Sequence, residues 1–172
     1  MLLLVYDYMP YGSLDKRLFG GSALILSWGD HYKILLGAAS ALQYLHSGAD
    51  KKVVHRGIKS SNIMLDSDLN AYLGDFELAL GSFDFLVNWV RSLYCKGRIL
   101  EAIDKRLENN IEVDEAERVL LLGLACSHPI AEDRPRSKDL LLMLSGCMPI
   151  PDISPFTPTA PSLQQVLQRT KH

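Results

Sequence analysis

Apolar and polar positions divide the chain into short strands, several helices and an irregular tail. An apolar run at 1–5 predicts a buried strand at the start. Residues 10–13 carry the Pro, Gly and Ser signals of a turn, and Ser13 is placed to cap a short helix that ends at Leu18. The first part of the chain is therefore expected to form a strand, a turn and one short helix.

The longest helical pattern covers residues 28–46. Its apolar positions recur at steps of three and four residues, which predicts a long buried helix, and Gly48 is placed to end it. Short apolar runs at 53–54, 63–65 and 71–73 predict strands, with a turn between the last two. The helical positions are Tyr32, Leu35, Leu36, Ala39, Leu42 and Leu45.

The second half of the chain is patterned for helices. They are predicted at 85–94, at 113–126 with Asp114 as the cap, and at 137–144. The first of these helices carries Leu86, Trp89, Val90 and Leu93 on one face. Residues 149–161 contain five prolines and no periodicity, which predicts an extended tail.

These elements predict a mainly α-helical fold with short β hairpins. One domain is expected at 1–148, followed by a proline-rich tail at 149–172. A chain of 172 residues is long enough for one domain with a core of its own.

Composition and charge narrow the function classes. The 18 basic and 20 acidic residues give a net charge of −2, so nothing favours nucleic acid or an anionic membrane as a partner. The three cysteines have no metal-ligand spacing, which predicts reduced thiols. No apolar run has the length of a membrane span, and Asp7 follows the first run too early for a signal peptide. A cytoplasmic location is expected.

Two short motifs carry the candidate chemistry. Residues 55–62 have the sequence His-Arg-Gly-Ile-Lys-Ser-Ser-Asn, which resembles the catalytic loop His-Arg-Asp-x-x-x-x-Asn of protein kinases. Residues 75–77, Asp-Phe-Glu, resemble the Asp-Phe-Gly motif that binds magnesium in the same enzymes. Gly57 stands where the kinase motif has the catalytic Asp, and glycine can accept no proton.

The resemblance extends along most of the chain to about residue 161. The segments 3–15, 26–46, 53–80 and 120–135 resemble the hinge, the long helix, the catalytic and metal loops and the last helices of plant receptor-like Ser/Thr kinases. The lectin-domain receptor kinases are the most similar group. The resemblance implies a protein-kinase-like fold, ATP-dependent protein phosphorylation as the ancestral activity, and ATP and magnesium as cofactors.

The resemblance also implies positions for the nucleotide. Tyr6 falls at the gatekeeper position, and Asp7 and Met9 fall where backbone groups bind adenine. Leu65 falls in the strand that forms the floor of the adenine site.

Three further residues correspond to the phosphate and metal positions. Lys59 is placed to face the transferred phosphate, and Asn62 and Asp75 are placed as the two magnesium ligands. Glu77 replaces the glycine that lets the backbone turn after the metal-binding Asp.

Departures from the family pattern predict a partial large lobe without phosphotransfer. The glycine-rich loop and most of the small lobe would precede Met1, and Gly57 removes the base. Near residue 82 the chain passes from the metal loop to residues that lie far downstream in the family, so the activation segment and the central helix are absent. This omission predicts exposed apolar surface. It also leaves Arg134 without its usual Glu partner, so Arg134 is expected in solvent.

The leading hypothesis is a catalytically inactive fragment of a receptor-like kinase. Three alternatives remain open: a working Ser/Thr kinase, a faulty gene model, and an interaction module that binds an intact receptor kinase. The interaction module would use the helix face around Trp89 and Leu93.

Overall fold

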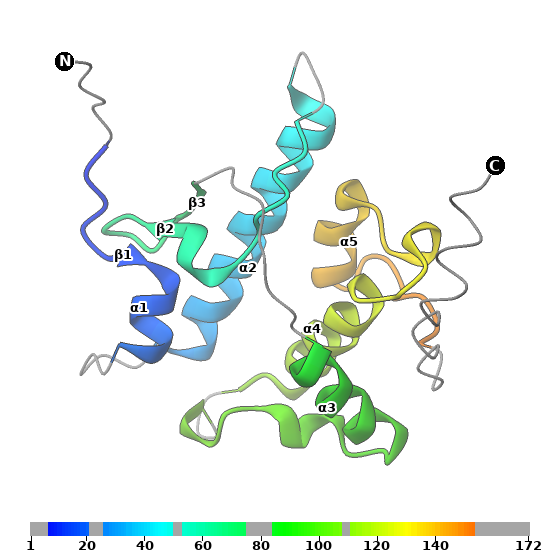
Figure 1. Ribbon diagram of the computed structural model, residues 1–172. Helices are drawn as coiled ribbons and strands as arrows, with labels where there is room; N and C mark the ends of the chain where they lie inside the picture. The colour runs from blue at the N-terminus through cyan, green and yellow to red at the C-terminus, as the bar shows by residue number, and fades with distance from the viewer. Residues whose placement is uncertain (1–6, 21–25, 50–52, 75–83, 108–110, 154–172) are drawn as a thin grey trace, which may run out of the picture.

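The long helix α2 (Trp28–Gln43) lies between two groups of elements in the computed structural model (Figure 1). A three-stranded sheet and the short helix α1 lie on one side, and α4 and α5 lie on the other, with α3 beyond α4. The structure describes residues 7–20, 26–49, 53–74, 84–107 and 111–153, so the strand predicted at 1–5 lies outside it.

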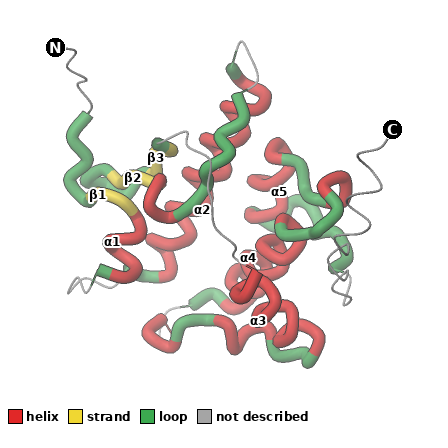
Figure 2. Tube along the Cα trace, viewed as in Figure 1, coloured by secondary structure: helices red, strands yellow, loops and turns green. Residues whose placement is uncertain are grey.

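Helices make up most of the described chain, and the strands are confined to one small sheet (Figure 2). The mainly α-helical fold with short β hairpins is therefore confirmed. The strands and α-helices are β1 (Gly12–Ser13), α1 (Leu14–Phe19), α2, β2 (Ile63–Leu65), β3 (Ala71–Leu73), α3 (Asp84–Cys95), α4 (Val113–Cys126) and α5 (Leu140–Leu144). One π turn and several 3-10 turns join them: η1 (Tyr44–Gly48), η2 (Ser60–Asn62), η3 (Ile99–Ala102), η4 (Lys105–Leu107), η5 (Ala131–Asp133) and η6 (Ser137–Asp139).

A capping box begins helix α2. The Ser27 hydroxyl accepts a hydrogen bond from the Asp30 N–H, and the Asp30 carboxylate accepts one from the Ser27 N–H at 2.9 Å. The helix continues into the π turn η1 and ends at Gly48, as the sequence predicted. A Cβ at Gly48 would lie 2.8 Å from the Tyr44 ring, so a larger residue here would require the exposed Tyr44 side chain to shift.

The sheet is antiparallel with strand order β1-β2-β3. The strands predicted at 63–65 and 71–73 are confirmed as β2 and β3, with Met64 opposite Tyr72. Strand β1 lies inside the region predicted as a turn, and its Ser13 pairs with Met64. The strand predicted at 53–54 is wrong, because the Val53 N–H donates to the Leu45 carbonyl of the π turn η1 and not to a neighbouring strand.

Among the described residues, two small apolar clusters join α2 to its neighbours. One contains Leu26, Ile34, Ile63 and Leu65 and joins α2 to the sheet. The other contains Ala39, Leu122, Met143 and Leu144 and joins α2 to α4 and α5. Helix α2 thus contributes to both clusters from different parts of its surface. Its buried stripe differs in detail from the predicted one, because Ile34 is 2% exposed and the neighbouring Leu35 is 37% exposed.

The C-terminal helices occupy the predicted positions with different ends. Glu112 occupies the N-cap position of helix α4 without a side-chain capping bond, whereas the predicted cap Asp114 lies in the first turn. The predicted helix at 137–144 begins with the 3-10 turn η6 and becomes α-helical at Leu140. No helix in the described ranges combines the length and the apolar character that a bilayer crossing requires.

Side-chain hydrogen bonds connect α2 to the C-terminal helices across long stretches of sequence. The Trp28 indole N–H donates to the Glu115 carboxylate of α4 at 2.9 Å. The Tyr32 hydroxyl donates to the Leu144 carbonyl of α5 at 2.6 Å, and the His46 ring lies 2.8 Å from the Ser137 hydroxyl. These bonds fix how the two halves of the described chain pack on each other.

We expect the Trp28–Glu115 hydrogen bond to couple the two halves energetically. A double-mutant cycle of Trp28→Phe and Glu115→Ala, measured by urea unfolding, should give a coupling free energy of about 1–2 kcal/mol, because the acceptor is charged and the pair is partly buried. The exposed pair Arg98 and Glu101, which lies within one turn of the chain, should give a smaller coupling. Additive effects at Trp28 and Glu115 would contradict this role.

The turn between β2 and β3 makes stability depend on pH. The Asn70 side chain donates to the Asp66 carboxylate, and the Asn70 and Asp68 N–H groups donate to it as well. These bonds, that of the Asn70 side chain first, lower the pKa of Asp66 below its ordinary value of 3.8. A lowered folded-state pKa stabilises the fold above the ordinary value, and this contribution is lost as the pH falls through the folded-state pKa.

We therefore expect Asp66→Ala to lower the unfolding temperature at neutral pH. The difference from the wild type should shrink below pH 3.8, because protonation removes the same stabilisation from the wild-type turn. Asp68→Ala is the matched control, since the Asp68 carboxylate accepts none of these bonds. A difference between wild type and Asp66→Ala that does not change with pH would contradict the assignment. Thermal unfolding followed by circular dichroism measures both variants.

Candidate functional site

The loop at 55–62 is held by a closed ring of four hydrogen bonds. The Gly57 N–H donates to Nδ1 of His55 at 3.2 Å, and Nε2 of His55 lies 3.0 Å from the Gly74 carbonyl. The Gly74 N–H donates to the Asn62 carbonyl at 2.9 Å, and the Asn62 side-chain Nδ2 donates to the Gly57 carbonyl at 3.0 Å. His55 and Asn62 are 2% and 4% exposed, so this ring is shielded from water.

The ring fixes the tautomer of His55 and the orientation of the Asn62 amide. Because Nδ1 of His55 accepts a hydrogen bond from the Gly57 N–H, Nε2 carries the ring hydrogen and donates it to the Gly74 carbonyl. Because the Asn62 amide nitrogen donates to the Gly57 carbonyl, Oδ1 is the acceptor atom of the same amide group. The Ser61 hydroxyl lies 3.3 Å from that Oδ1. His55 therefore has a structural role in this loop, and both polar atoms of the Asn62 side chain take part in hydrogen bonds.

Gly57 contributes its backbone to this ring and no side chain to the site. It is buried, and the residue before it, Arg56, has a φ of 61°, in the left-handed region that costs a side-chain-bearing residue about 1 kcal/mol. The two hydrogen bonds of Gly57 offset this cost and keep the loop in its bend. Gly57 thus contributes no side chain that could accept a proton in this loop.

The predicted nucleotide residues occupy different environments. Tyr6 lies outside the described residues. Asp7 is exposed, and the half-buried Met9 accepts a hydrogen bond from the Gly12 N–H at 3.0 Å. Pairing of β1 with β2 places the chain just after Met9 beside the strand that follows the catalytic loop.

Leu65 does not have the surroundings expected of a floor for adenine. It is fully buried in the core cluster beside Ile34, which leaves no surface for a ring to contact. Met64 points to the other side of β2, is half-buried, and lies 3.7 Å from the position of a Cβ built on Gly74. The alternation of side chains along a strand is the sequence signal that separates Met64 from Leu65.

The phosphate and metal positions are only partly described. Lys59 is half-buried immediately before η2, and its carbonyl accepts from the Asn62 N–H at 3.0 Å. Asp75 lies outside the described residues, but its neighbour Gly74 is bonded to Asn62. The structure therefore brings Gly57, Lys59, Asn62 and Gly74 together. Within the described ranges no group of three acidic, His or Cys side chains could hold a metal ion.

Arg134 is exposed, as expected for a residue without its family partner. Its Nε donates to the His128 carbonyl, and its terminal nitrogen lies 3.5 Å from the Pro129 carbonyl. Backbone carbonyls at the end of α4 thus receive the guanidinium in place of a carboxylate.

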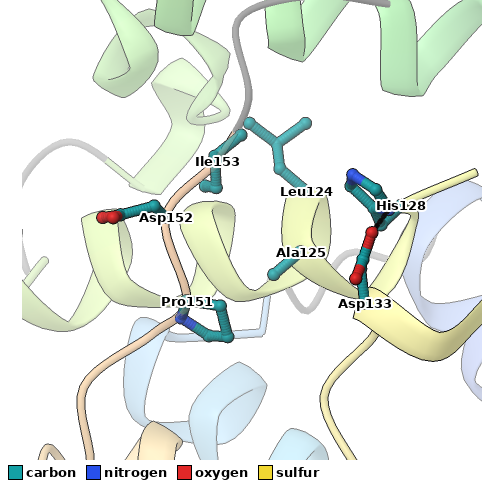
Figure 3. Close-up of a pocket in the computed structure, with 7 residues that line it drawn as sticks. All are labelled: Leu124, Ala125, His128, Asp133, Pro151, Asp152 and Ile153. Carbon is teal, nitrogen blue, oxygen red and sulfur yellow. Dashed lines mark ion pairs between the residues drawn. The ribbon is translucent and has the colours of Figure 1, made fainter. Parts of the chain in front are cut away.

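A separate cavity of about 240 Å³ lies at the end of α4 (Figure 3). His128 and Asp133 form an ion pair at 3.5 Å on one side of it, and Asp152 points away from that pair on the other side. The walls between them are Leu124, Ala125, Pro151 and Ile153. Because the polar groups do not converge on one point, the cavity suggests no ligand.

Comparison with known proteins identifies what the chain is similar to. Residues 1–82 match the protein kinase domain family. The L-type lectin-domain containing receptor kinase SIT2 of Oryza sativa subsp. japonica is 34% identical over 212 residues, which cover 90% of this chain and 32% of the relative. The probable L-type lectin-domain containing receptor kinase I.5 of Arabidopsis thaliana is 36% identical over 213 residues, covering 91% and 32%. The chain spans about a third of the length of these relatives.

A solved structure supports the fold. The pseudokinase domain of BIR2, an immune regulator of the RLK/Pelle family, superposes with a TM-score of 0.71 and 23% sequence identity. The match covers 82% of this chain and 58% of that domain. The kinase-like fold predicted from the motifs is confirmed.

The hydrogen-bond ring predicts a structural role for Asn62 that does not depend on metal. Asn62→Ala should lower the unfolding free energy by about 1–3 kcal/mol in metal-free buffer, because the buried Gly57 carbonyl loses its donor. Asn62→Asp keeps an oxygen for a metal but cannot donate in its ionised form, so it should also destabilise the fold. Chemical denaturation measures both variants, with Ser61→Ala at the exposed neighbouring position as the control. Wild-type stability of Asn62→Asp would contradict the ring.

Proposed function

Since this chain is part of a protein kinase domain of the plant receptor-like kinase type, we propose that it retains the frame of the catalytic loop and does not transfer phosphate. The observation that carries the proposal is Gly57. Its backbone is held on both sides by His55 and Asn62, which supports a loop that keeps its bend while position 57 lacks the side chain that would accept the substrate proton. A positioned general base contributes roughly 10²–10⁴-fold to rate.

The length of the match to a relative, compared with the length of this chain, supports the same proposal. The similarity to the rice relative extends over 212 residues, whereas this chain has 172, so at least 40 of those positions have no counterpart here. The kinase family match ends at residue 82, which is where we propose that the omission begins. We propose one domain at 1–148 with an internal omission near 82 that includes the activation segment and the central helix, and a tail at 149–172.

The residues that remain would hold a nucleotide weakly. Asn62 offers Oδ1 and Asp75 a carboxylate, the oxygen donors that magnesium prefers, and Lys59 is next to them in the loop. Magnesium, when bound with ATP, would neutralise phosphate charge. Backbone groups of Asp7 and Met9 would face adenine, beneath the gatekeeper Tyr6. The burial of Leu65 favours Met64 as the residue below the ring.

A second candidate function is binding to an intact receptor kinase. The observation that favours it is the similar fold of the BIR2 domain, which is named as a pseudokinase and an immune regulator. A domain of this kind acts through its surface and needs no phosphotransfer. Co-purification of the tagged chain with full-length relatives expressed in the same cells tests this function, and recovery of the chain alone would count against it.

We expect that Gly57→Asp will not restore phosphotransfer. The substitution returns the base, but the proposed omission near residue 82 still removes the segment that positions a substrate hydroxyl, and positioning alone accounts for a large part of such barriers. Transfer of labelled phosphate to a generic peptide substrate, with magnesium and ATP, measures the effect, and Gly57→Asn is the matched control. Turnover by Gly57→Asp but not by Gly57→Asn would show that the base is the main loss.

Phosphate transfer by the wild-type chain, abolished by Asp75→Ala, would overturn the proposal itself. A titration of nucleotide with and without magnesium separates binding from chemistry. Binding that strengthens with magnesium and is lost in Asp75→Ala would show that the metal positions remain functional without a base.

A further inference from the structure

The contact surface predicted on helix α3 around Trp89 and Leu93 is wrong at Leu93. That side chain is 9% exposed and belongs to the buried side of the helix, which packs on η3 and α4. A different surface in the described ranges combines apolar and charged groups, and it follows helix α4.

A groove of about 440 Å³ lies along one side of α4. Its helix wall consists of residues three or four positions apart, which share one face of α4. The other wall is the chain that follows α5. The lining residues are Asp114, Glu117, Arg118 and Leu121 of α4, and Gly146, Met148, Pro149 and Ile150 after α5.

The acidic groups of the groove lie at one end of it. Asp114 and Glu117 are exposed in the first half of α4, and Leu121 lies one turn further along the helix. Neither carboxylate forms an ion pair with a described residue. Arg118, the cation of the groove, donates to the Leu144 carbonyl at 3.2 Å. The groove therefore fits a segment that is apolar first and basic afterwards, in the direction from Leu121 to Asp114.

The end of this chain has such a sequence. Residues 154–172 lie outside the described residues, and the part at 154–162 contains prolines at 155, 158 and 161. The part at 163–171, which we call the tail segment, has Arg169 and Lys171 as its only charged side chains. Its apolar residues and Lys171 recur at steps of three and four residues, which is typical of one face of a helix. They are Leu163, Val166, Leu167 and Lys171.

The point where the described chain ends places the tail segment within reach of the groove. Residues 151–153 pass the C-terminal end of α4, where Ile153 and Pro151 lie beside Leu124 and Ala125 (Figure 3). The nine residues 154–162 can extend over about 30 Å, and the 14-residue helix α4 is about 21 Å long. A chain that turns back from this end meets Leu121 before it meets the carboxylates.

We propose that the tail segment docks as a helix in the groove of its own molecule, antiparallel to α4. Leu167 then lies near Leu121 and Lys171 near Glu117, because both pairs are four residues apart and run in opposite directions. Attachment through a short linker favours this occupant over a separate peptide, since the linker gives an effective concentration of millimolar order. The contact is small, so docking is reversible. The proposal does not rest on the absence of phosphotransfer.

Paramagnetic broadening in the full chain tests the docking. The three exposed cysteines are replaced by Ser, and a nitroxide label is attached through Thr170→Cys. The label should broaden the amide resonances of Glu117 and Gly146 far more than that of Tyr72 in the sheet. The broadening should not change on dilution, because the segment and the groove belong to one molecule. A wild-type circular dichroism spectrum of the labelled chain shows that the substitutions leave the fold intact.

Charge reversal separates docking from random contact of a tethered segment. Lys171→Glu should lower the ratio of docked to free tail about two- to fivefold, which is the effect of one exposed ion pair on an equilibrium. Glu117→Lys should do the same, and the two substitutions together should restore the broadening. Asp68→Lys is the matched control, because it makes the same change of charge in the exposed turn between β2 and β3 and should leave the broadening unchanged.

Three results would each overturn the proposal. They are an unbroadened Glu117 resonance in the labelled chain, broadening that disappears on dilution, and a double charge reversal that fails to restore what the single reversals remove. Stronger broadening at Phe85 and Trp89 of α3 than at Gly146 would also overturn it, because the tail segment would then occupy another surface.

Discussion

The described fold depends on one helix that serves two cores. Helix α2 places Ile34 in the cluster against the sheet and Ala39 in the cluster against α4 and α5. Each cluster is small, so neither could hold its surrounding elements without the surface that α2 supplies. The polar contacts of Trp28 and Tyr32 with α4 and α5 add direction to this packing, because hydrogen bonds fix an orientation that apolar contact alone leaves free.

Hydrogen bonds also explain why the loop at 55–62 keeps its shape although glycine stands at the position of the base. All four bonds of the ring use backbone groups of Gly57 and Gly74 or the side chains of His55 and Asn62. A side chain at position 57 takes part in none of them. The geometry of the loop and its acid–base chemistry are therefore encoded by different atoms, and one can be lost without the other. The proposed loss of activity needs no disordered loop.

Sequence patterns predicted the positions of helices and strands better than the tertiary contacts and burial of their residues. The glycine at 48 and the three- and four-residue steps are local signals, so the course of α2 was predictable, whereas the capping box at Ser27 was not predicted. The strand expected at 53–54 failed because its β-type residues bond to the end of a helix that is adjacent only in the fold. Motif spacing located Asn62 and Lys59, but it could not show that Leu65 faces the core, which depends on the register between β1 and β2. The exposure of Phe85 and Trp89 on α3 likewise depends on which elements pack beside the helix, and the local sequence does not contain this information.

Because the packing centres on α2, helix α3 is held less directly than the other helices. Helix α3 packs mainly on η3 and α4, so its connection to α2 runs through α4. Leu93 packs on the buried side of α3. The exposed side carries Phe85 and Trp89, which no described element covers as fully as Leu93 is covered. The apolar area on this exposed side of α3 is therefore still in contact with water, whereas the elements next to α2 bury theirs in the two clusters.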